Sequence, residues 1–248
     1  MSYGRYDTKT GPVGQRTFVL IPGAGGTKWY WHRVVPLLQE AGHLAIPVDL
    51  PADDPAAGLA EYARLVTDAA DGSGNVTLVA QSLGGFTAPL AAMKTDIRAL
   101  VFVNAMIPLP GETPGEWWDA TGWEEARRAA AERGGYPAEF DLDAYFLHDV
   151  PPEVAAAGER YQRAESDSVF ASVCDFGDWP RVPIRVAAGA GDRFFPASFQ
   201  QRVAKDRLGI EADLLPGGHL NALSEPAALT DYLLTATGPN TTPMAHRR

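Results

Sequence analysis

Short runs of apolar residues alternate along the chain with longer segments whose apolar positions recur every three or four residues. The runs are rich in Val, Leu, Ile and Phe and have the length of β-strands, whereas the longer segments have the spacing of amphipathic helices. We expect strands at residues 17–21, 44–49, 76–80, 99–104, 184–188 and 212–215. We expect helices at residues 31–41, 57–70, 83–94, 198–207 and 224–236. This alternation predicts an α/β fold with a mostly parallel sheet and helices on both of its faces.

The alternation is interrupted between residues 107 and 180. That stretch contains several prolines, the tryptophans Trp117, Trp118 and Trp123 and three helix-like pieces, but no convincing buried strand. We interpret residues 107–180 as a helical cap, inserted into a core that consists of residues 1–106 and 181–237. Residues 238–248 contain Pro, Asn and Thr but no apolar pattern, and we expect them to form a disordered tail.

Composition and charge narrow the classes of partner. The chain has 248 residues, of which 46% are hydrophobic, and this is enough for one well-packed core. Its formal net charge of −10 repels phosphate backbones and anionic lipid, so we expect neither a nucleic-acid partner nor a membrane partner. A small-molecule substrate fits this charge better. The sequence leaves the oligomeric state open, and a homodimer is compatible with it.

Cysteine content and the N-terminal segment bear on the compartment. Cys174 is the single cysteine, so no intrachain disulfide can form and a reducing compartment is natural. Residues 1–16 lack the apolar run of a secretory signal, and no run approaches the length of a membrane span. We therefore expect a cytoplasmic location.

A serine follows the third expected strand in a pattern typical of a catalytic nucleophile. Residues 79–85 read Val-Ala-Gln-Ser-Leu-Gly-Gly and lead from a β-branched run into an apolar helical pattern. A nucleophile elbow needs this arrangement, because a strained turn exposes the hydroxyl and small flanking residues let strand and helix approach. Ala80 replaces the first glycine of the usual G-x-S-x-G pattern, and Gly84 keeps the second. The alternative interpretation is that Ser82 only caps the following helix.

An acid and a histidine follow two later strands. Asp192 comes just after the strand expected at 184–188, and His219 comes just after the strand expected at 212–215. Because the carboxyl ends of parallel strands share one edge of the sheet, both side chains are expected near Ser82. We predict a triad in which Ser82 is the nucleophile, His219 the general base and Asp192 the acid that orients it. Taken singly, Asp192 and His219 each have the alternative role of a helix cap.

The same edge of the sheet offers backbone donors for an oxyanion hole. Such a hole needs two N–H groups aimed at the developing charge, and Leu83, directly after the serine, supplies one. The second is expected from the loop after the first strand, where residues 21–27 read Ile-Pro-Gly-Ala-Gly-Gly-Thr. This loop has neither the G-x-G-x-x-G nor the G-x-x-x-x-G-K spacing of phosphate-binding loops. The sequence also lacks a metal-ligand motif, so we expect no cofactor and no metal.

With these motifs in view, the chain resembles the α/β-hydrolase superfamily, and within it the small branch of plant methylesterases and hydroxynitrile lyases. The resemblance spans nearly the whole chain, from Thr17 to Leu234. Its markers are the run Phe-Val-Leu-Ile-Pro-Gly-Ala that begins at residue 18, Trp29, Trp31, His32, the Ser82 elbow, Asp192 and His219. The resemblance implies an α/β-hydrolase fold with a helical cap. It also implies that the backbone N–H of Ala24 is the second oxyanion donor.

Departures from this branch bear on the reaction. By the resemblance, its lyases carry a threonine in the oxyanion loop and a lysine just after the catalytic histidine, whereas these places hold Gly23 and Leu220 here. Lyase chemistry is therefore disfavoured. The usual histidine before the oxyanion loop is Pro22 here. Halide displacement would need an aspartate nucleophile, which Ser82 excludes.

The chemistry that remains is acyl transfer to water. We predict a serine hydrolase that cleaves an ester, thioester or lactone of a small, largely hydrophobic molecule through an acyl-enzyme. The alternatives on the same fold are a small-molecule receptor and a non-hydrolytic biosynthetic enzyme, such as a lyase or cyclase.

The cap is expected to supply the substrate pocket. Large aromatic side chains over a catalytic serine favour an apolar substrate and exclude water. The candidate substrate-binding residues are Trp29 and Trp31, which the resemblance places in the segment beneath the cap, and Trp117, Trp118 and His148, from the cap itself. The alternative for the cap tryptophans is that they only pack the interior of the cap.

Overall fold

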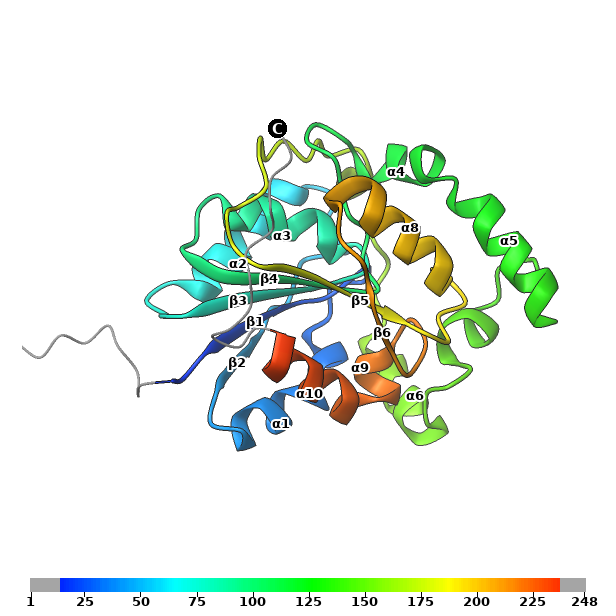
Figure 1. The fold of residues 1–248 in the computed structure, drawn as a ribbon, viewed down its shortest axis with the longest axis horizontal. Helices are drawn as coiled ribbons and strands as arrows, with labels where there is room; N and C mark the ends of the chain where they lie inside the picture. Colours follow the sequence, from blue (N-terminus) through cyan, green and yellow to red (C-terminus); the bar gives the residue numbers. More distant parts are fainter. Residues whose placement is uncertain (1–13, 237–248) are drawn as a thin grey trace, which may run out of the picture.

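The computed structural model describes residues 14–236, so the tail expected at residues 238–248 lies outside the described residues. The described chain forms a parallel β-sheet with helices on both faces (Figure 1). The strands are β1 (Thr17–Ile21), β2 (Leu44–Pro47), β3 (Val76–Gln81), β4 (Ile97–Val103), β5 (Ile184–Gly189) and β6 (Asp213–Leu215). Each expected strand is confirmed to within two residues, and so is the α/β fold class.

Helices cover the two faces of the sheet. One face carries α2 (Leu59–Ala70), α3 (Gly84–Ala92) and α8 (Ala197–Leu208). The other face carries η1 (Lys28–Trp31), α1 (Val34–Glu40), α9 (Asn221–Ser224) and α10 (Pro226–Ala236). Successive residues of a strand point to opposite faces, and both faces are buried. This is why the inner strands β1, β3, β4 and β5 are mostly apolar, whereas Asp213 and Leu214 of the edge strand β6 are exposed.

The order of the strands brings the functional loops together. The strands lie in the order β2-β1-β3-β4-β5-β6, so the chain leaves β1 toward one side of the sheet and returns to the other side to form β3. Because β1 and β3 are neighbouring parallel strands, the loops at their carboxyl ends begin side by side at one edge of the sheet. The first of these loops begins at Pro22, and the second contains Ser82.

Residues 107–180 lie between β4 and β5, and we call them the cap segment. Its helices and turns are α4 (Pro114–Thr121), α5 (Trp123–Gly134), the π-helical turn η2 (Asp143–Leu147), α6 (Pro152–Gly158), the 3₁₀ turn η3 (Glu159–Tyr161) and α7 (Asp167–Phe170). These are more pieces than the three expected, because η2, η3 and α7 are too short to leave a helical period in the sequence.

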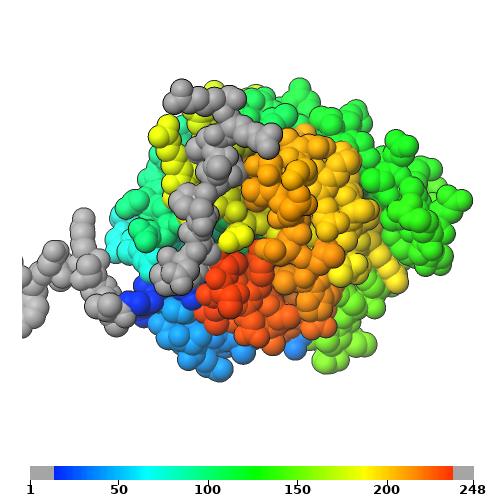
Figure 2. All heavy atoms as spheres, viewed as in Figure 1, coloured from blue at the N-terminus to red at the C-terminus, as the bar shows by residue number. Residues whose placement is uncertain are grey.

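The cap segment packs along one side of the sheet. Figure 1 shows α4 and α5 beyond α8, and in Figure 2 the green residues of these two helices form the edge of the molecule. Glu112 and Cys174 pair as an isolated antiparallel bridge, which joins the two ends of the segment. Within residues 14–236, no helix has both the length and the apolar character needed to cross a membrane.

Candidate active site

Ser82 lies in a sharp turn between β3 and α3. Its backbone φ is +49°, in the left-handed region that residues other than glycine rarely occupy. The turn is closely packed, because a Cβ added at Gly84 would lie 2.5 Å from the Pro22 carbonyl oxygen. A Cβ added at Gly85 would lie 1.9 Å from the Met106 carbonyl oxygen. The two glycines thus let α3 approach the sheet, and the strained turn presents the serine at its edge.

Ser82, His219 and Asp192 form one hydrogen-bonded chain. His219 Nε2 lies 3.0 Å from Ser82 Oγ, and His219 Nδ1 lies 2.9 Å from Asp192 Oδ2. The side chains of His219 and Asp192 are buried, while Ser82 is 9% exposed. When Nδ1–H donates to the carboxylate, Nε2 is left to accept the serine proton. This geometry is the one that a general base needs to activate a serine nucleophile.

Both oxygens of the Asp192 carboxylate are held by donors. Oδ1 accepts the backbone N–H groups of Phe194 at 2.9 Å and Phe195 at 2.8 Å. Oδ2 accepts Gln200 Nε2 at 3.0 Å in addition to the His219 ring. These donors stabilise a charged carboxylate in a buried place. They also fix its direction, and with it the orientation of the imidazole.

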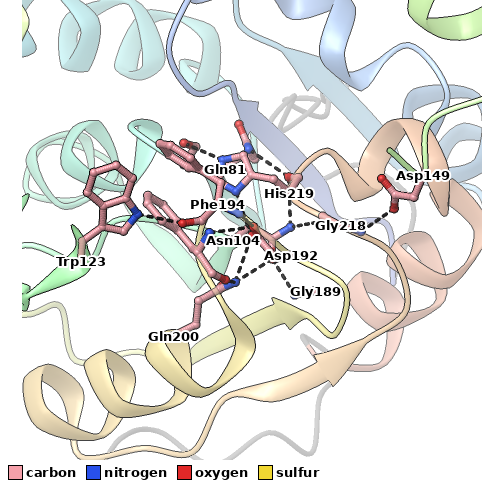
Figure 3. A network of polar contacts seen from close by, with 12 residues as sticks. Gln81, Asn104, Trp123, Asp149, Gly189, Asp192, Phe194, Gln200, Gly218 and His219 are labelled. Atoms are coloured by element: carbon pink, nitrogen blue, oxygen red, sulfur yellow. Dashed lines mark hydrogen bonds and ion pairs between the residues drawn. The ribbon is translucent and has the colours of Figure 1, made fainter. Parts of the chain in front are cut away.

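Asn104 holds the loop that carries His219 in place, and it was not among the site residues predicted from the sequence. It directly follows β4, is fully buried and has a backbone φ of +46°. Its Oδ1 accepts the Gly189 N–H at 2.6 Å, and its Nδ2 donates to the carbonyl oxygens of Gly218 at 3.0 Å and His219 at 3.1 Å (Figure 3). A polar residue at the end of an apolar strand, on the same edge as Ser82, was the signal that could have revealed it.

Two backbone N–H groups beside the serine are unused. Those of Ala24 and Leu83 donate to no acceptor within residues 14–236. Ala24 is exposed on a turn that is closed by the Gly26 N–H, which donates to the Gly23 carbonyl oxygen at 3.1 Å. A Cβ added at Gly23 would lie 2.7 Å from Ser82 Cβ. The loop after β1 therefore touches the serine turn, as an oxyanion hole requires.

Aromatic rings surround His219. The ring centroids of Phe146, Phe194 and Phe195 lie 4.9, 5.2 and 4.9 Å from that of the imidazole. Phe146 comes from η2 in the cap segment, whereas the other two rings follow Asp192 in the chain. An apolar surrounding of this kind keeps bulk water from the imidazole and strengthens its electrostatic interactions.

A cavity of about 340 Å³ lies beside the loop that carries Ala24. Core and cap segment both contribute to its wall, which is mostly apolar. Among the lining residues are Ala24, Trp29, Tyr30, Gln81, Leu142, Phe146, Leu147, Ala155, Tyr161, Arg163, Leu220 and Leu223. Its volume is in the range of small-molecule sites. No group of three or more His, Cys, Asp or Glu within residues 14–236 is arranged to hold a metal ion.

The aromatic residues proposed to bind substrate have different locations. Trp29 lines the cavity. Trp31 and Trp117 do not line it, because both are fully buried in the hydrophobic core. The Trp117 ring packs against Phe195, and its Nε1 donates to the Ile107 carbonyl oxygen at 3.1 Å.

Trp118 and His148 pack near the loops of Asp192 and His219 but do not line the cavity. Trp118 packs on Trp123 and on Phe194, so its contact with the triad is indirect. His148 lies beneath the loop of His219, where a Cβ added at Gly218 would be 2.9 Å from His148 Cε1. Burial lowers the pKa of His148, which favours the neutral imidazole there.

Comparison with known proteins identifies the family. Residues 18–232 match the model of the alpha/beta hydrolase family. The chain therefore belongs to this family, as the elbow, the strand order and the positions of the three polar residues indicate.

The more specific similarities are to plant esterases. The chain is 34% identical over 114 residues to "Probable esterase PIR7A" of Oryza sativa subsp. indica. The aligned stretch covers 41% of this chain and 43% of that protein. It is 31% identical over 142 residues to "Methylesterase 3" of Arabidopsis thaliana, which covers 49% of this chain and 54% of that protein. The matches thus span about half the length of these relatives. Polyneuridine aldehyde esterase has a similar fold, with a TM-score of 0.71 at 21% identity over 90% of this chain and 100% of that chain.

Proposed function

We propose that this protein is a serine hydrolase that cleaves an ester, thioester or lactone of a small, largely hydrophobic molecule through an acyl-enzyme. The observation that carries the proposal is the hydrogen-bonded chain from Ser82 through His219 to Asp192, next to two unused backbone N–H groups. The similarity to proteins named esterase and methylesterase supports the same class of reaction.

The proposed reaction has two halves. His219 Nε2 takes the Ser82 proton while Oγ attacks the carbonyl carbon, and the backbone N–H groups of Ala24 and Leu83 stabilise the oxyanion. The imidazolium, paired with Asp192, then gives its proton to the leaving group, and an acyl-serine remains. Water, deprotonated by His219, attacks the acyl carbon and releases the acid, and the proton returns to Ser82.

The contacts of Gly23 and Leu220 argue against a lyase. A Cβ added at Gly23 would lie 2.5 Å from Gln81 Oε1, so the space for a larger residue in this part of the oxyanion loop is already filled. Leu220 lines the cavity with an apolar side chain and has no charge to hold an anion released there. Both features favour acyl transfer to water.

The cavity favours an uncharged, apolar substrate group. Its wall carries aliphatic and aromatic side chains, and its charged lining residue, Arg163, already pairs with Asp49 at 3.0 Å. A charged substrate group would lose its hydration there without finding a free partner.

Labelling and kinetics test the proposal together. A fluorophosphonate should modify Ser82, and the adduct is located by mass spectrometry of the digested protein. With p-nitrophenyl acetate, Ser82→Ala and His219→Ala should each lower kcat roughly 10³-fold or more, because members of a triad act as a unit. Ser73→Ala, in the loop after α2, is the matched control and should behave as the unchanged protein.

Two results would overturn the proposal. One is an adduct on a residue other than Ser82, or none, with folded protein. The other is turnover retained by pure Ser82→Ala protein. Tight binding of small esters without any turnover would favour a receptor, and a product other than the free acid would favour a non-hydrolytic enzyme.

A further inference from the structure

The turn that carries Ala24 is held from the side of the cap segment. Gly25, the next residue, donates its N–H to Glu165 Oε2 at 2.7 Å. Its carbonyl oxygen accepts from Arg163 Nε at 3.1 Å. Arg163 and Glu165 thus satisfy both polar backbone atoms of Gly25. They lie close together in the sequence, 138 and 140 residues further along the chain.

The conformation of this turn depends on the peptide that Glu165 binds. The bond from the Gly26 N–H to the Gly23 carbonyl oxygen, with a φ of +82° at Gly25, marks a type II turn over residues 23–26. Type I and type II turns differ in the orientation of their central peptide, which here joins Ala24 to Gly25. A carboxylate that accepts the Gly25 N–H stabilises one of these orientations. It therefore also restrains the position of Ala24.

Glu165 is itself fixed by the core. Its Oε1 accepts the hydroxyl of Tyr62, a buried residue of α2, at 2.7 Å. The next residue, Ser166, donates its N–H to the Ala52 carbonyl oxygen at 2.7 Å. The carboxylate is thus a rigid link between α2 and the turn. Glu165 is absent from the cavity wall, so its influence on a bound substrate passes through Gly25.

We propose that Glu165 is a positioning residue for the oxyanion hole, which it serves by holding the turn that presents the Ala24 N–H. This role rests on the proposed serine-hydrolase function. Preorganised donors stabilise a developing oxyanion better than donors that must be brought into place, because the cost of ordering them is already met in the folded protein. Loss of the Glu165 carboxylate should therefore weaken transition-state binding more than substrate binding.

The test compares three substitutions of Glu165. Glu165→Ala removes the acceptor. Glu165→Asp keeps the charge but shortens the side chain by one methylene, so that it cannot reach both Gly25 and Tyr62. Glu165→Gln keeps the contacts, since its amide oxygen accepts the Gly25 N–H and its amide nitrogen donates to the Tyr62 oxygen. Glu153→Ala, an exposed residue at the start of α6, is the matched control.

Two measurements separate positioning from a merely structural role. For an ester substrate, Glu165→Ala should lower kcat about tenfold or more with little change in KM, a part of the 10²–10³-fold cost of losing a whole oxyanion donor. A trifluoromethyl ketone forms a tetrahedral oxyanion on the serine, and its inhibition constant should rise by a similar factor. Glu165→Asp should show the same changes to a smaller degree, and Glu165→Gln should restore both values to within about threefold.

Several results would overturn this proposal. If kcat and the ketone inhibition constant of Glu165→Ala stay within twofold of the unchanged protein, Glu165 has no positioning role. The same holds if only KM or the melting temperature changes. Should Glu165→Ala fail to fold, Glu165→Asp decides by the same criteria. An unchanged protein that neither turns over esters nor reacts at Ser82 would refute the proposed function itself, whereas an active protein that tolerates Glu165→Ala refutes only the positioning role.

Discussion

At the scale of the residue, Glu165 carries a carboxylate in a place that is unfavourable for charge. Burial has the largest effect and raises the pKa of Glu165. The hydrogen bonds from Tyr62 and Gly25 and the charge of Arg163 lower this pKa, but by less. A carboxyl whose pKa is raised by folding stabilises the protein at a pH below its unfolded pKa. That contribution is lost as the pH rises through the folded pKa. Burial of the charged carboxylate therefore lowers stability at neutral pH, and its hydrogen bonds to Gly25 and Tyr62 offset part of that cost.

The raised pKa of the Glu165 carboxyl leads to a prediction for the variant Glu165→Gln. The amide does not titrate, so at pH 7.5 the variant should melt at a higher temperature than the unchanged protein. The difference should shrink as the pH falls toward about 4.3, the ordinary pKa of a glutamate side chain, because the unchanged protein regains its protonated carboxyl there. Melting curves over this pH range measure it, with Glu153→Gln as the exposed control. A difference that is the same at every pH would contradict the assignment.

Only some of the residues of this site could be predicted from the sequence. Ser82, Asp192 and His219 could be predicted because each follows a strand expected from the alternation of strands and helices, and parallel strands end at one edge. Asn104 and Glu165 were missed, since each acts through contacts with residues 85 to 140 positions away. Glu165 leaves no local period or spacing in the sequence, and Asn104 leaves only the signal of a polar residue at the end of an apolar strand.

At the scale of the element, the aromatic residues of α4 form a support behind the triad. Trp117 packs on Phe195, and Phe195 in turn contacts the ring of His219. The sequence could indicate that this region is helical and aromatic, but not which way its side chains point. The short pieces α4 and η2 have no long amphipathic period, so their buried faces are set by tertiary packing.

We expect Trp117→Ala to act on stability and not on substrate preference. A fully buried tryptophan typically contributes enough packing that its replacement costs about 3–5 kcal/mol. Phe146→Ala, which alters the cavity wall, should instead change the preference for acyl chain length. Chemical denaturation gives the first effect, and steady-state kinetics over a series of p-nitrophenyl esters gives the second. A changed chain-length preference in folded Trp117→Ala protein would refute this division.

A carboxylate of the cap segment also binds the loop that carries His219, as Glu165 binds the turn that carries Ala24. In Figure 3, Gly218 lies between Asn104 and Asp149, and its N–H donates to Asp149 Oδ2 at 2.5 Å. Asp149 belongs to the short connection between η2 and α6. Core and cap segment therefore hold this loop from two directions, one through the Gly218 carbonyl oxygen and the other through its N–H.

We predict that Asp149→Ala slows the reaction of Ser82. Without this acceptor the Gly218 N–H is unpaired, and a small displacement of His219 away from the serine costs about tenfold or more in rate. The rate constant for fluorophosphonate labelling of Ser82 measures this effect without a contribution from the binding of an ester substrate in the cavity. Asp149→Asn should retain most of the rate, because its amide oxygen can still accept the bond. Equal labelling rates in the unchanged protein and Asp149→Ala would contradict the prediction.

At the scale of the whole molecule, the cap segment is also joined to the core by an ion pair that forms no hydrogen bond with the triad. Arg207, near the end of α8, forms an ion pair with Glu112, just before α4, through both of its terminal nitrogens. One of these nitrogens also donates to the Ile107 carbonyl oxygen at 2.7 Å. The two charged side chains are only 7% and 9% exposed. This ion pair therefore links the beginning of the cap segment to a core helix in a place with little water.

The buried ion pair should matter for stability and not for catalysis. Removing one partner of such a pair leaves an uncompensated buried charge, which typically costs about 3–5 kcal/mol, whereas replacing both partners with apolar residues of similar size is often neutral. We therefore expect Glu112→Ala to lower the free energy of unfolding strongly and the combination of Glu112→Leu with Arg207→Met to recover most of it. Denaturant unfolding measures both effects. Because neither residue lines the cavity or bonds to the triad, kcat of the folded fraction at 25 °C should be unchanged in both proteins. A loss of kcat as large as that expected for Glu165→Ala would mean that the whole interface of the cap segment, and not its two carboxylate contacts, positions the catalytic loops.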